Sequence, residues 1–194
     1  MRQTKSTVFA EFIPTPTVEG KPVMKKTSTI FLVNSALIAA LYAGLTYFSA
    51  IWGLAYGPVQ LRISEALTIL PILTPAAIPG LTIGCFIGNL GSPYGIVDIL
   101  CGTFATAIAA VFTHLLRGVR LKNIPLLSPL APVVFNALII GAEITFFTGT
   151  AANFTAFLTA AGWVGLSELI VCYALGLPLG LALENNNILA KTKL

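Results

Sequence analysis

Residues 60–91 read QLRISEALTILPILTPAAIPGLTIGCFIGNLG, an almost continuous apolar run that nevertheless contains Arg62, Glu65 and Asn89. Asp98 follows shortly after it, and three prolines interrupt it: Pro71, Pro75 and Pro79. Ionisable groups inside apolar segments are costly in a membrane and usually mark functional sites. We therefore expect these polar residues to help form a pocket for a small polar molecule, open to the outside.

The composition is that of an integral membrane protein. Of the 194 residues, 56% are apolar and 9% are charged, and the mean hydropathy is +0.90. A soluble domain carries about a quarter charged residues. The net charge of +4 does not indicate nucleic-acid binding, because the basic residues other than Arg62 lie in the two tails and one loop, where orientation in the membrane explains them. The cysteines (Cys85, Cys101 and Cys172) are too widely spaced for a metal site and are expected to be buried free thiols.

The distribution of polar residues divides the chain into three regions. Residues 1–27 are polar, contain prolines and lack the features of a cleavable signal peptide, so they are expected to form a flexible cytoplasmic tail. Residues 28–185 are expected to form one membrane domain, and residues 186–194 a second cytoplasmic tail.

The fold class expected is an all-α bundle of six transmembrane helices with both termini in the cytoplasm. Residues 29–51, 96–116, 126–148 and 154–183 are long enough to span a bilayer, which takes about 20 residues. Lysine and arginine cluster in the N-terminal tail, at 117–122 and at 191–193, so if all three face the cytoplasm, residues 63–90 cross twice or not at all. The prolines favour a hairpin of two short crossings, helices 2 and 3, over a re-entrant dip.

Four carboxylates lie within this bundle, and Arg62 is the one cation close to them: Glu65, Asp98, Glu143 and Glu168. At most two of them can pair with it. The others must be protonated, hydrogen-bonded within the protein or completed by a cationic or N–H-rich ligand. A structural hydrogen bond or an interfacial charge remains an alternative for each.

Helical spacing places several of these groups on shared faces. Asn136 and Glu143 are seven residues apart, and Glu168 continues a stripe that begins at Phe157 and includes small residues. A second stripe of small residues, Ala36, Ala40 and Gly44, recurs every four positions in the first helix. Small residues allow either close helix packing or, between helices, room for a ligand, and on the first helix either internal packing or the docking of a partner.

Six short segments resemble the QueT-type family, the substrate-binding S components of energy-coupling factor (ECF) transporters. They are VQLRISEALT (59–68), PAAIPG (75–80), GCFIGN (84–89), DILCGT (98–103), FNAL (135–138) and GLSELIVCY (165–173). The resemblance covers about residues 28–185. It implies six helices, a pocket facing outward in the bacterial plasma membrane, and a queuosine precursor such as preQ0, preQ1 or queuine as ligand. It also implies a membrane T subunit, which docks on the first-helix stripe, and two ATPase subunits.

The resemblance suggests a role for each candidate residue. A 7-deazaguanine presents an N–H and an amine side by side, which one carboxylate can accept. Glu168 or Glu65 would then accept hydrogen bonds from this edge of the base, and Asn136 or Asn89 would donate one to the carbonyl of the base. Glu143 would attract an amine of the ligand. The remaining candidates are Arg62 and Asp98 in the site, Phe157 and Tyr173 as stacking rings, and Trp52 and Tyr56 in a first outer loop that covers the ligand.

Other functions are less well supported by the sequence. A proton-coupled secondary transporter would use the carboxylates as proton relays, but no internal repeat is detectable. An enzyme is not expected, because the chain contains no His-Glu-x-x-His or Gly-x-Ser-x-Gly motif and no nucleophile–histidine pairing. No cofactor is expected. The chain also lacks a phosphate-binding P-loop, so an ATP-driven mechanism requires other subunits.

Overall fold

A computed structural model describes residues 26–57, 59–148 and 152–185 of the chain. The described residues form helices, apart from one isolated antiparallel bridge between Leu121 and Ile124. The two predicted tails lie outside the described residues, except that the first helix already begins at Lys26. The expected all-helical fold is thus confirmed for the part of the chain that is described.

Four long rods are apolar enough to cross a membrane: Thr29–Ile51, Ile96–Gly118, Leu130–Phe147 and Phe154–Asn185. The first rod belongs to α1 (Lys26–Ile51), and the second comprises α3 (Ile96–Leu115) and a short 3₁₀ turn, η3 (Leu116–Gly118). The third comprises α4 (Leu130–Glu143) and a π-helical turn, η4 (Ile144–Thr148). The fourth runs from α5 (Phe154–Val171) through a second π-helical turn, η5 (Cys172–Gly176), into α6 (Leu177–Asn185).

The proline-containing stretch forms two short helices, as the sequence predicted, but the first is not an α-helix. It is a 3₁₀-helix, η2 (Ile63–Ile72), and it is followed by α2 (Ala77–Asn89). Pro71 lies inside η2, where proline cannot donate the backbone hydrogen bond of an α-helix. A 3₁₀-helix rises about 2.0 Å per residue, so η2 extends further than an α-helix of the same length.

The turn of this hairpin lies near the C-terminal end of α3. The Pro71 carbonyl accepts a hydrogen bond of 2.6 Å from Nδ1 of His114, which is in the last turn of α3. The Ala76 carbonyl accepts one of 2.9 Å from Ser35 on α1. At the other end of the hairpin, Arg62 contacts Asn89. The hairpin therefore runs along the length of α3. It starts near the beginning of α3, turns near the last turn of α3, and returns to the beginning.

Glycines set the distance between α1 and α2. A Cβ atom added at Gly80 would lie 2.8 Å from the Ser35 carbonyl oxygen, and one at Gly84 would lie 2.8 Å from the Ala39 carbonyl oxygen. At Gly88 it would lie 3.0 Å from the Thr46 side chain. These glycines recur every four residues, so they form one face of α2, and the α1 backbone packs directly on that face.

The small residues of α5 also serve helix packing. A Cβ atom added at Gly141 of α4 would lie 2.8 Å from Ala161 Cα, and one at Gly165 would lie 3.2 Å from Ala137 Cβ. The alternative reading of this α5 stripe, room for a ligand, is therefore not what the structure shows. By contrast, Ala36, Ala40 and Gly44 on α1 are exposed.

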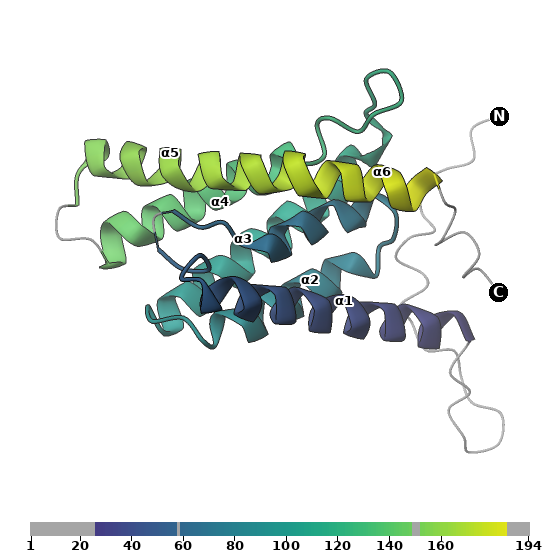
Figure 1. Ribbon diagram of the computed structural model, residues 1–194, viewed down its shortest axis with the longest axis horizontal. Coiled ribbons are helices and arrows are strands. Elements are labelled where there is room, and N and C mark those ends of the chain that lie inside the picture. The colour runs from purple at the N-terminus through teal and green to yellow at the C-terminus, as the bar shows by residue number, and fades with distance from the viewer. Residues whose placement is uncertain (1–25, 58, 149–151, 186–194) are drawn as a thin grey trace, which may run out of the picture.

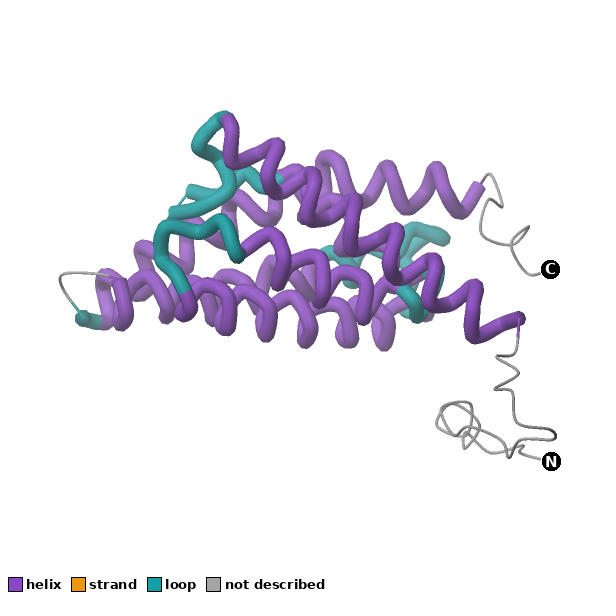
Figure 2. The backbone as a smooth tube through the Cα atoms, turned by 90° about the horizontal axis from the view of Figure 1, so that it is seen from below, coloured by secondary structure: helices purple, strands orange, loops and turns teal. Residues whose placement is uncertain are grey.

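The beginning of α1 and the end of α6 lie at the same end of the bundle (Figures 1 and 2). The loop between α3 and α4 lies at this end as well, and Arg120 in it makes a two-pronged ion pair with Glu184 of α6, at 2.7 and 3.0 Å. These hydrogen bonds raise the pKa of Arg120. The basic cluster at 117–122 therefore shares one end of the molecule with the described ends of the chain.

Candidate functional site

The structure divides the predicted site residues between two buried clusters rather than one pocket. The Arg62 cluster consists of Tyr56, Arg62, Asn89 and Asp98 and lies where α2 ends and α3 begins. The Glu65–Glu168 cluster consists of Tyr42, Glu65, Asn136, Glu168 and Cys172 and lies deeper in the bundle. Arg62 and Glu65, predicted to share a helix face, thus take part in different clusters.

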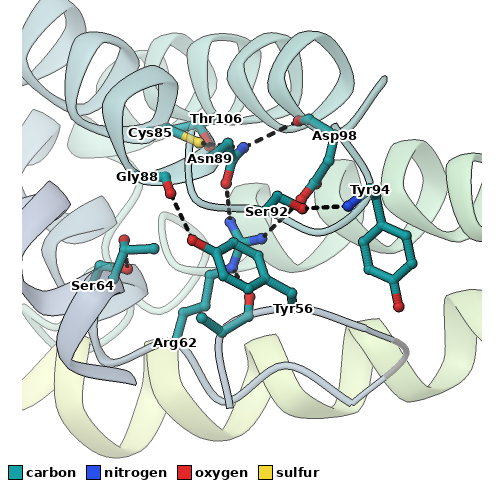
Figure 3. Close-up of polar contacts among 12 residues, drawn as sticks. Tyr56, Arg62, Ser64, Cys85, Gly88, Asn89, Ser92, Tyr94, Asp98 and Thr106 are labelled. Atoms are coloured by element: carbon teal, nitrogen blue, oxygen red, sulfur yellow. Dashed lines mark hydrogen bonds and ion pairs between the residues drawn. The ribbon is translucent and has the colours of Figure 1, made fainter. Parts of the chain in front are cut away.

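Arg62 is the centre of its cluster and is only 4% exposed. Its Nε donates to the Ala55 carbonyl of the first loop, and its Nη1 donates to Asn89 Oδ1 at 3.0 Å (Figure 3). Its Nη2 lies 3.9 Å from Asp98 Oδ2. The one buried cation near the carboxylates thus joins the loop, α2 and α3, and the carboxylate that it faces is Asp98.

Asn89 ties α2 to the beginning of α3. Its Nδ2 donates to the Asp98 carbonyl at 3.1 Å and lies 3.5 Å from the Cys85 sulfur. A Cβ atom at Gly102 would clash with this Nδ2. Gly102 is therefore small because the Asn89 amide occupies the space beside it.

Tyr56 folds the first loop over Arg62, as Figure 3 shows. The Arg62 guanidinium carbon lies 5.2 Å from the centre of the Tyr56 ring, and the Tyr56 hydroxyl donates to the Gly88 carbonyl at 2.7 Å. Burial raises the pKa of the Tyr56 phenol, so it remains a neutral donor at physiological pH. Trp52, the other residue predicted for this cover, is 69% exposed.

The Glu65–Glu168 cluster joins four parts of the bundle: α1, η2, α4 and the α5–η5 rod. The Tyr42 hydroxyl of α1 donates to Glu65 Oε1. The Asn136 amide of α4 donates to Glu168 Oε1 at 2.8 Å. Cys172 lies between the two carboxyl-bearing residues, with its sulfur 3.6 Å from Glu168 Oε2 and 3.8 Å from the Glu65 backbone oxygen.

Three buried carboxylate oxygens have no hydrogen-bond partner among the described residues: Glu65 Oε2, Asp98 Oδ2 and Glu143 Oε2. Both oxygens of Glu168, by contrast, have protein neighbours. Glu143 is 2% exposed and lies within electrostatic range of Asp98 and Arg62. Buried acceptors without donors are costly, so these oxygens are suited to a ligand that brings N–H groups or a positive charge.

Both π-helical turns adjoin candidate residues. The turn η4 begins directly after Glu143, and η5 begins at Cys172. Such turns are rare and often occur at functional sites. The described residues contain no group of three or more histidine, cysteine, aspartate or glutamate side chains arranged to hold a metal ion.

Two grooves lie on the surface, and none of the four carboxylates lines either of them. A groove of about 510 Å³ lies beside η4 and the first half of α5, and one of about 230 Å³ lies between α3 and α4. The carboxylates themselves are packed among helices. Access to them from solution therefore requires a movement of the surrounding elements, and the first loop and its Tyr56 cover one approach.

The two predicted stacking rings have partners outside the clusters, although Tyr173 directly follows Cys172 in the chain. Phe157 is in the first turn of α5 and pairs with Phe154, with ring centres 6.3 Å apart. Tyr173 donates its hydroxyl to the Leu126 carbonyl at 2.7 Å, in the loop before α4. No contact of either ring with the carboxylates is found among the described residues, and their role as ligand contacts stays a prediction.

Sequence reasoning missed three features of the site. Tyr42 was not a candidate, because a single tyrosine in an apolar helix carries no motif. Cys172 is predicted only as a buried free thiol and not as a site residue, although it lies in the same sequence segment as Glu168. The Gly80, Gly84 and Gly88 pattern was visible in the sequence at four-residue spacing and predicts the close approach of α2 to a neighbour. All three cysteines are free, but Cys101 is only half-buried.

The apolar rods and the buried polar clusters define a multi-pass membrane protein with a polar interior. Residues 32–185 match the sequence model of the QueT transporter family, and the chain belongs to this family. The queuosine precursor transporter QueT of Lactococcus lactis subsp. cremoris (strain MG1363) is 38% identical over 85 residues. This match covers 44% of the present chain and 50% of that relative, so the chain spans about half the length of the curated relative it matches. No solved structure matches the chain.

Proposed function

We propose that this chain is the substrate-binding membrane subunit of an ATP-driven, ECF-type uptake transporter and captures a queuosine precursor from outside the cell. Membership of the QueT transporter family supports the substrate class, and the similarity to the queuosine precursor transporter of Lactococcus lactis agrees with it. The observation that carries the proposal is the set of three buried carboxylate oxygens that have no hydrogen-bond donor in the described part of the chain: Glu65 Oε2, Asp98 Oδ2 and Glu143 Oε2.

The proposed topology has six crossings in the bacterial plasma membrane, with residues 1–27 and 186–194 as cytoplasmic tails around one membrane domain. The depth of the η2–α2 hairpin supports two short crossings, because its turn contacts His114 at the far end of α3. The shared end of α1, α6 and the basic loop supports the cytoplasmic assignment of that end. The Arg62 cluster then lies at the outer surface.

The chemistry of a 7-deazaguanine fits the free oxygens. Its ring N–H and exocyclic amine are adjacent donors, and its aminomethyl form adds a cation. Glu65 is a better candidate than Glu168 for reading the base edge, since Glu168 already contacts Asn136 and Cys172. Glu143, beside Asp98, is the candidate for the amine.

The partners proposed are a T subunit in the membrane and two ATPase subunits. The exposed stripe of Ala36, Ala40 and Gly44 supports T-subunit docking, because α1 packs on α2 through another face. No atom lies within 4 Å of a Cβ added at Gly44, apart from its own surroundings in the helix. A smooth exposed stripe of this kind allows the backbone of another helix to approach closely.

Calorimetry on the purified chain with preQ0, preQ1 and queuine tests the proposal. We expect at least one of them to bind, and we expect Glu65→Gln and Glu143→Gln to weaken that binding about tenfold or more, since each removes a charged acceptor. Glu184→Gln is the matched control, because Glu184 pairs with Arg120 at the opposite end of the bundle. Wild-type binding to none of the three ligands, or equal binding by all variants, would contradict the proposal.

The buried carboxyl groups of Glu65 and Glu168 are also the kind of group that a proton relay uses, and they favour one second candidate, a proton-coupled secondary transporter. The two functions differ in what drives uptake. Vesicles that contain only this chain would accumulate substrate under a pH gradient if it were a secondary transporter. Under the main proposal they would not, and accumulation would require the ATPase subunits and ATP.

A further inference from the structure

Helix α1 is joined to the η2 hairpin by a seam of hydrogen bonds along its length. Ser35 bonds to the Ala76 carbonyl at 2.9 Å, Thr46 bonds to the Ser64 hydroxyl at 2.8 Å, and the Ile63 amide bonds to Ser49 at 3.0 Å. Tyr42 lies in the middle of this seam. It is the member whose partner is a carboxylate, Glu65.

Tyr42 is fully buried and holds one oxygen of Glu65. Its hydroxyl donates to Oε1, while Oε2 is buried and has no hydrogen-bond partner among the described residues. The tyrosine thereby fixes the rotation of the carboxyl group. It also decides which oxygen is left for another donor.

Tyr42 is the donor that the structure gives to the Glu65 carboxylate. Two further donors, the Thr68 hydroxyl at 2.6 Å and the Cys172 sulfur at 3.8 Å, contact the Glu65 backbone oxygen instead. A carboxylate released from Tyr42 would have a second buried oxygen without a donor, which is costly, and its orientation would no longer be held. Its free oxygen would then no longer have a defined direction.

We propose that Tyr42 is a positioning residue for ligand recognition: it holds Glu65 Oε1 so that Oε2 alone faces the ligand. The inference rests on the proposed function, because it requires Glu65 to accept an N–H group of the ligand. Tyr42 itself does not contact the ligand. Its effect on binding passes through Glu65.

A double-mutant cycle tests this. Calorimetry with the precursor that the wild-type chain binds is carried out on Tyr42→Phe, Glu65→Gln and the double variant. We expect Tyr42→Phe to weaken binding about tenfold, the size of one hydrogen bond to a charged group. In the Glu65→Gln background the same substitution should have little further effect, because there is no longer a carboxylate to position. A role in packing alone would weaken binding equally in both backgrounds.

Tyr47→Phe is the matched control. Tyr47 is on the same helix, and its hydroxyl donates to a backbone carbonyl, that of Ile87, at 2.7 Å. We expect this variant to bind as the wild type does. Equal affinities of Tyr42→Phe and wild type, or equal losses in Tyr42→Phe and Tyr47→Phe, would overturn the inference. If Glu65→Gln bound normally while Glu143→Gln did not, the inference would fall and the proposed function would stand.

A measurement on the wild-type chain covers the case in which Tyr42→Phe does not fold. Ring-deuterated tyrosine identifies tyrosine bands in an infrared difference spectrum between ligand-bound and ligand-free protein. Ligand binding should perturb a buried tyrosine, because the ligand withdraws electron density from the carboxylate that Tyr42 donates to. A spectrum in which ligand shifts carboxylate bands and leaves every tyrosine band unchanged would overturn the inference. Failure of the wild type to bind any precursor would instead overturn the proposed function.

Discussion

At the scale of single residues, the buried polar groups of this chain serve two different purposes. Arg62 donates to a loop carbonyl and to Asn89, and its Nη2 lies 3.9 Å from Asp98 Oδ2, at ion-pair rather than hydrogen-bond distance. Glu65 and Glu143 each have one buried oxygen without a donor among the described residues. Residues of the first kind hold the bundle together, and residues of the second kind are the ones we expect to meet a ligand.

Gly102→Ala should destabilise the protein. The new Cβ atom would clash with the Asn89 amide, which already bonds to Arg62 and to the Asp98 carbonyl. Overpacking of this kind costs about 1–3 kcal/mol, so we expect a lower midpoint of thermal unfolding in detergent. Gly162→Ala is the control, since nothing lies within 4 Å of a Cβ atom there. Equal midpoints for the two variants would contradict this account of Asn89.

Arg62→Gln should loosen the first loop. The substitution removes the Nε contact with Ala55 and the cation beneath the Tyr56 ring, and it leaves Asp98 without its nearest positive charge. We expect faster proteolysis of residues 52–61 in the folded protein. Limited proteolysis followed by mass spectrometry measures this. Lys122→Gln, in the exposed loop at the other end of the bundle, is the control. An unchanged cleavage rate in Arg62→Gln would show that Arg62 does not hold the first loop in place.

At the scale of elements, the η2–α2 hairpin was the least certain part of the chain and is the part that positions the site. The prolines, together with the expected position of Arg62 and Asn89 at the outer surface of the membrane, were sufficient to predict that this stretch of chain turns back on itself. The 3₁₀ geometry of η2 was not predictable from the apolar pattern, because it depends on the tertiary bonds that η2 makes to α1 and His114.

Gly84→Leu should separate α1 from α2. A side chain at this position would meet the Ala39 carbonyl and the Tyr42 Cβ atom, both at 2.8 Å, and neither backbone can yield easily. We expect loss of folded protein, measured as the fraction that elutes as a monodisperse peak in detergent. Gly44→Leu, on the exposed face of α1, should elute normally. Normal elution of Gly84→Leu would contradict the glycine contact.

The candidate site was predictable only in part, for reasons that lie at the level of packing. Hydropathy and charge were sufficient to single out Glu65, Asp98, Glu143 and Glu168, because a carboxylate stands out in an apolar helix. They could not show which oxygens the protein itself satisfies, since that depends on partners distant in sequence. Tyr42 reaches Glu65 across 23 positions, and Asn136 reaches Glu168 across 32.

At the scale of the whole molecule, one helix connects an exposed surface with the buried site. The outer face of α1 carries Ala36, Ala40 and Gly44, and another face carries Tyr42, which holds Glu65. If a T subunit docks on the exposed stripe, a displacement of α1 would be transmitted to Glu65 through this hydrogen bond. Capture and release of the ligand would then be linked to assembly.

Gly44→Leu should weaken docking of the T subunit and leave ligand binding unchanged. A bulky side chain on the exposed stripe leaves the interior unchanged, because nothing lies within 4 Å of a Cβ atom at this position. We expect ligand affinity to remain within about twofold, the size of a typical surface substitution, while less T subunit co-purifies with the chain. Co-purification is compared with that of Leu100→Ala, an exposed position on α3. Undiminished recovery of the T subunit would place the docking surface elsewhere.

The measurement that tests the central claim most directly is mass spectrometry of the small molecules retained by the gently purified wild-type chain and by Glu65→Gln. We predict that a 7-deazaguanine remains with the wild-type chain and is lost from the variant, because the ligand supplies the donors that the buried carboxylates lack. Retention of the same molecule at equal occupancy by both proteins would contradict the claim that Glu65 is part of the site. Wild-type protein that retains and binds no such compound would contradict the function itself.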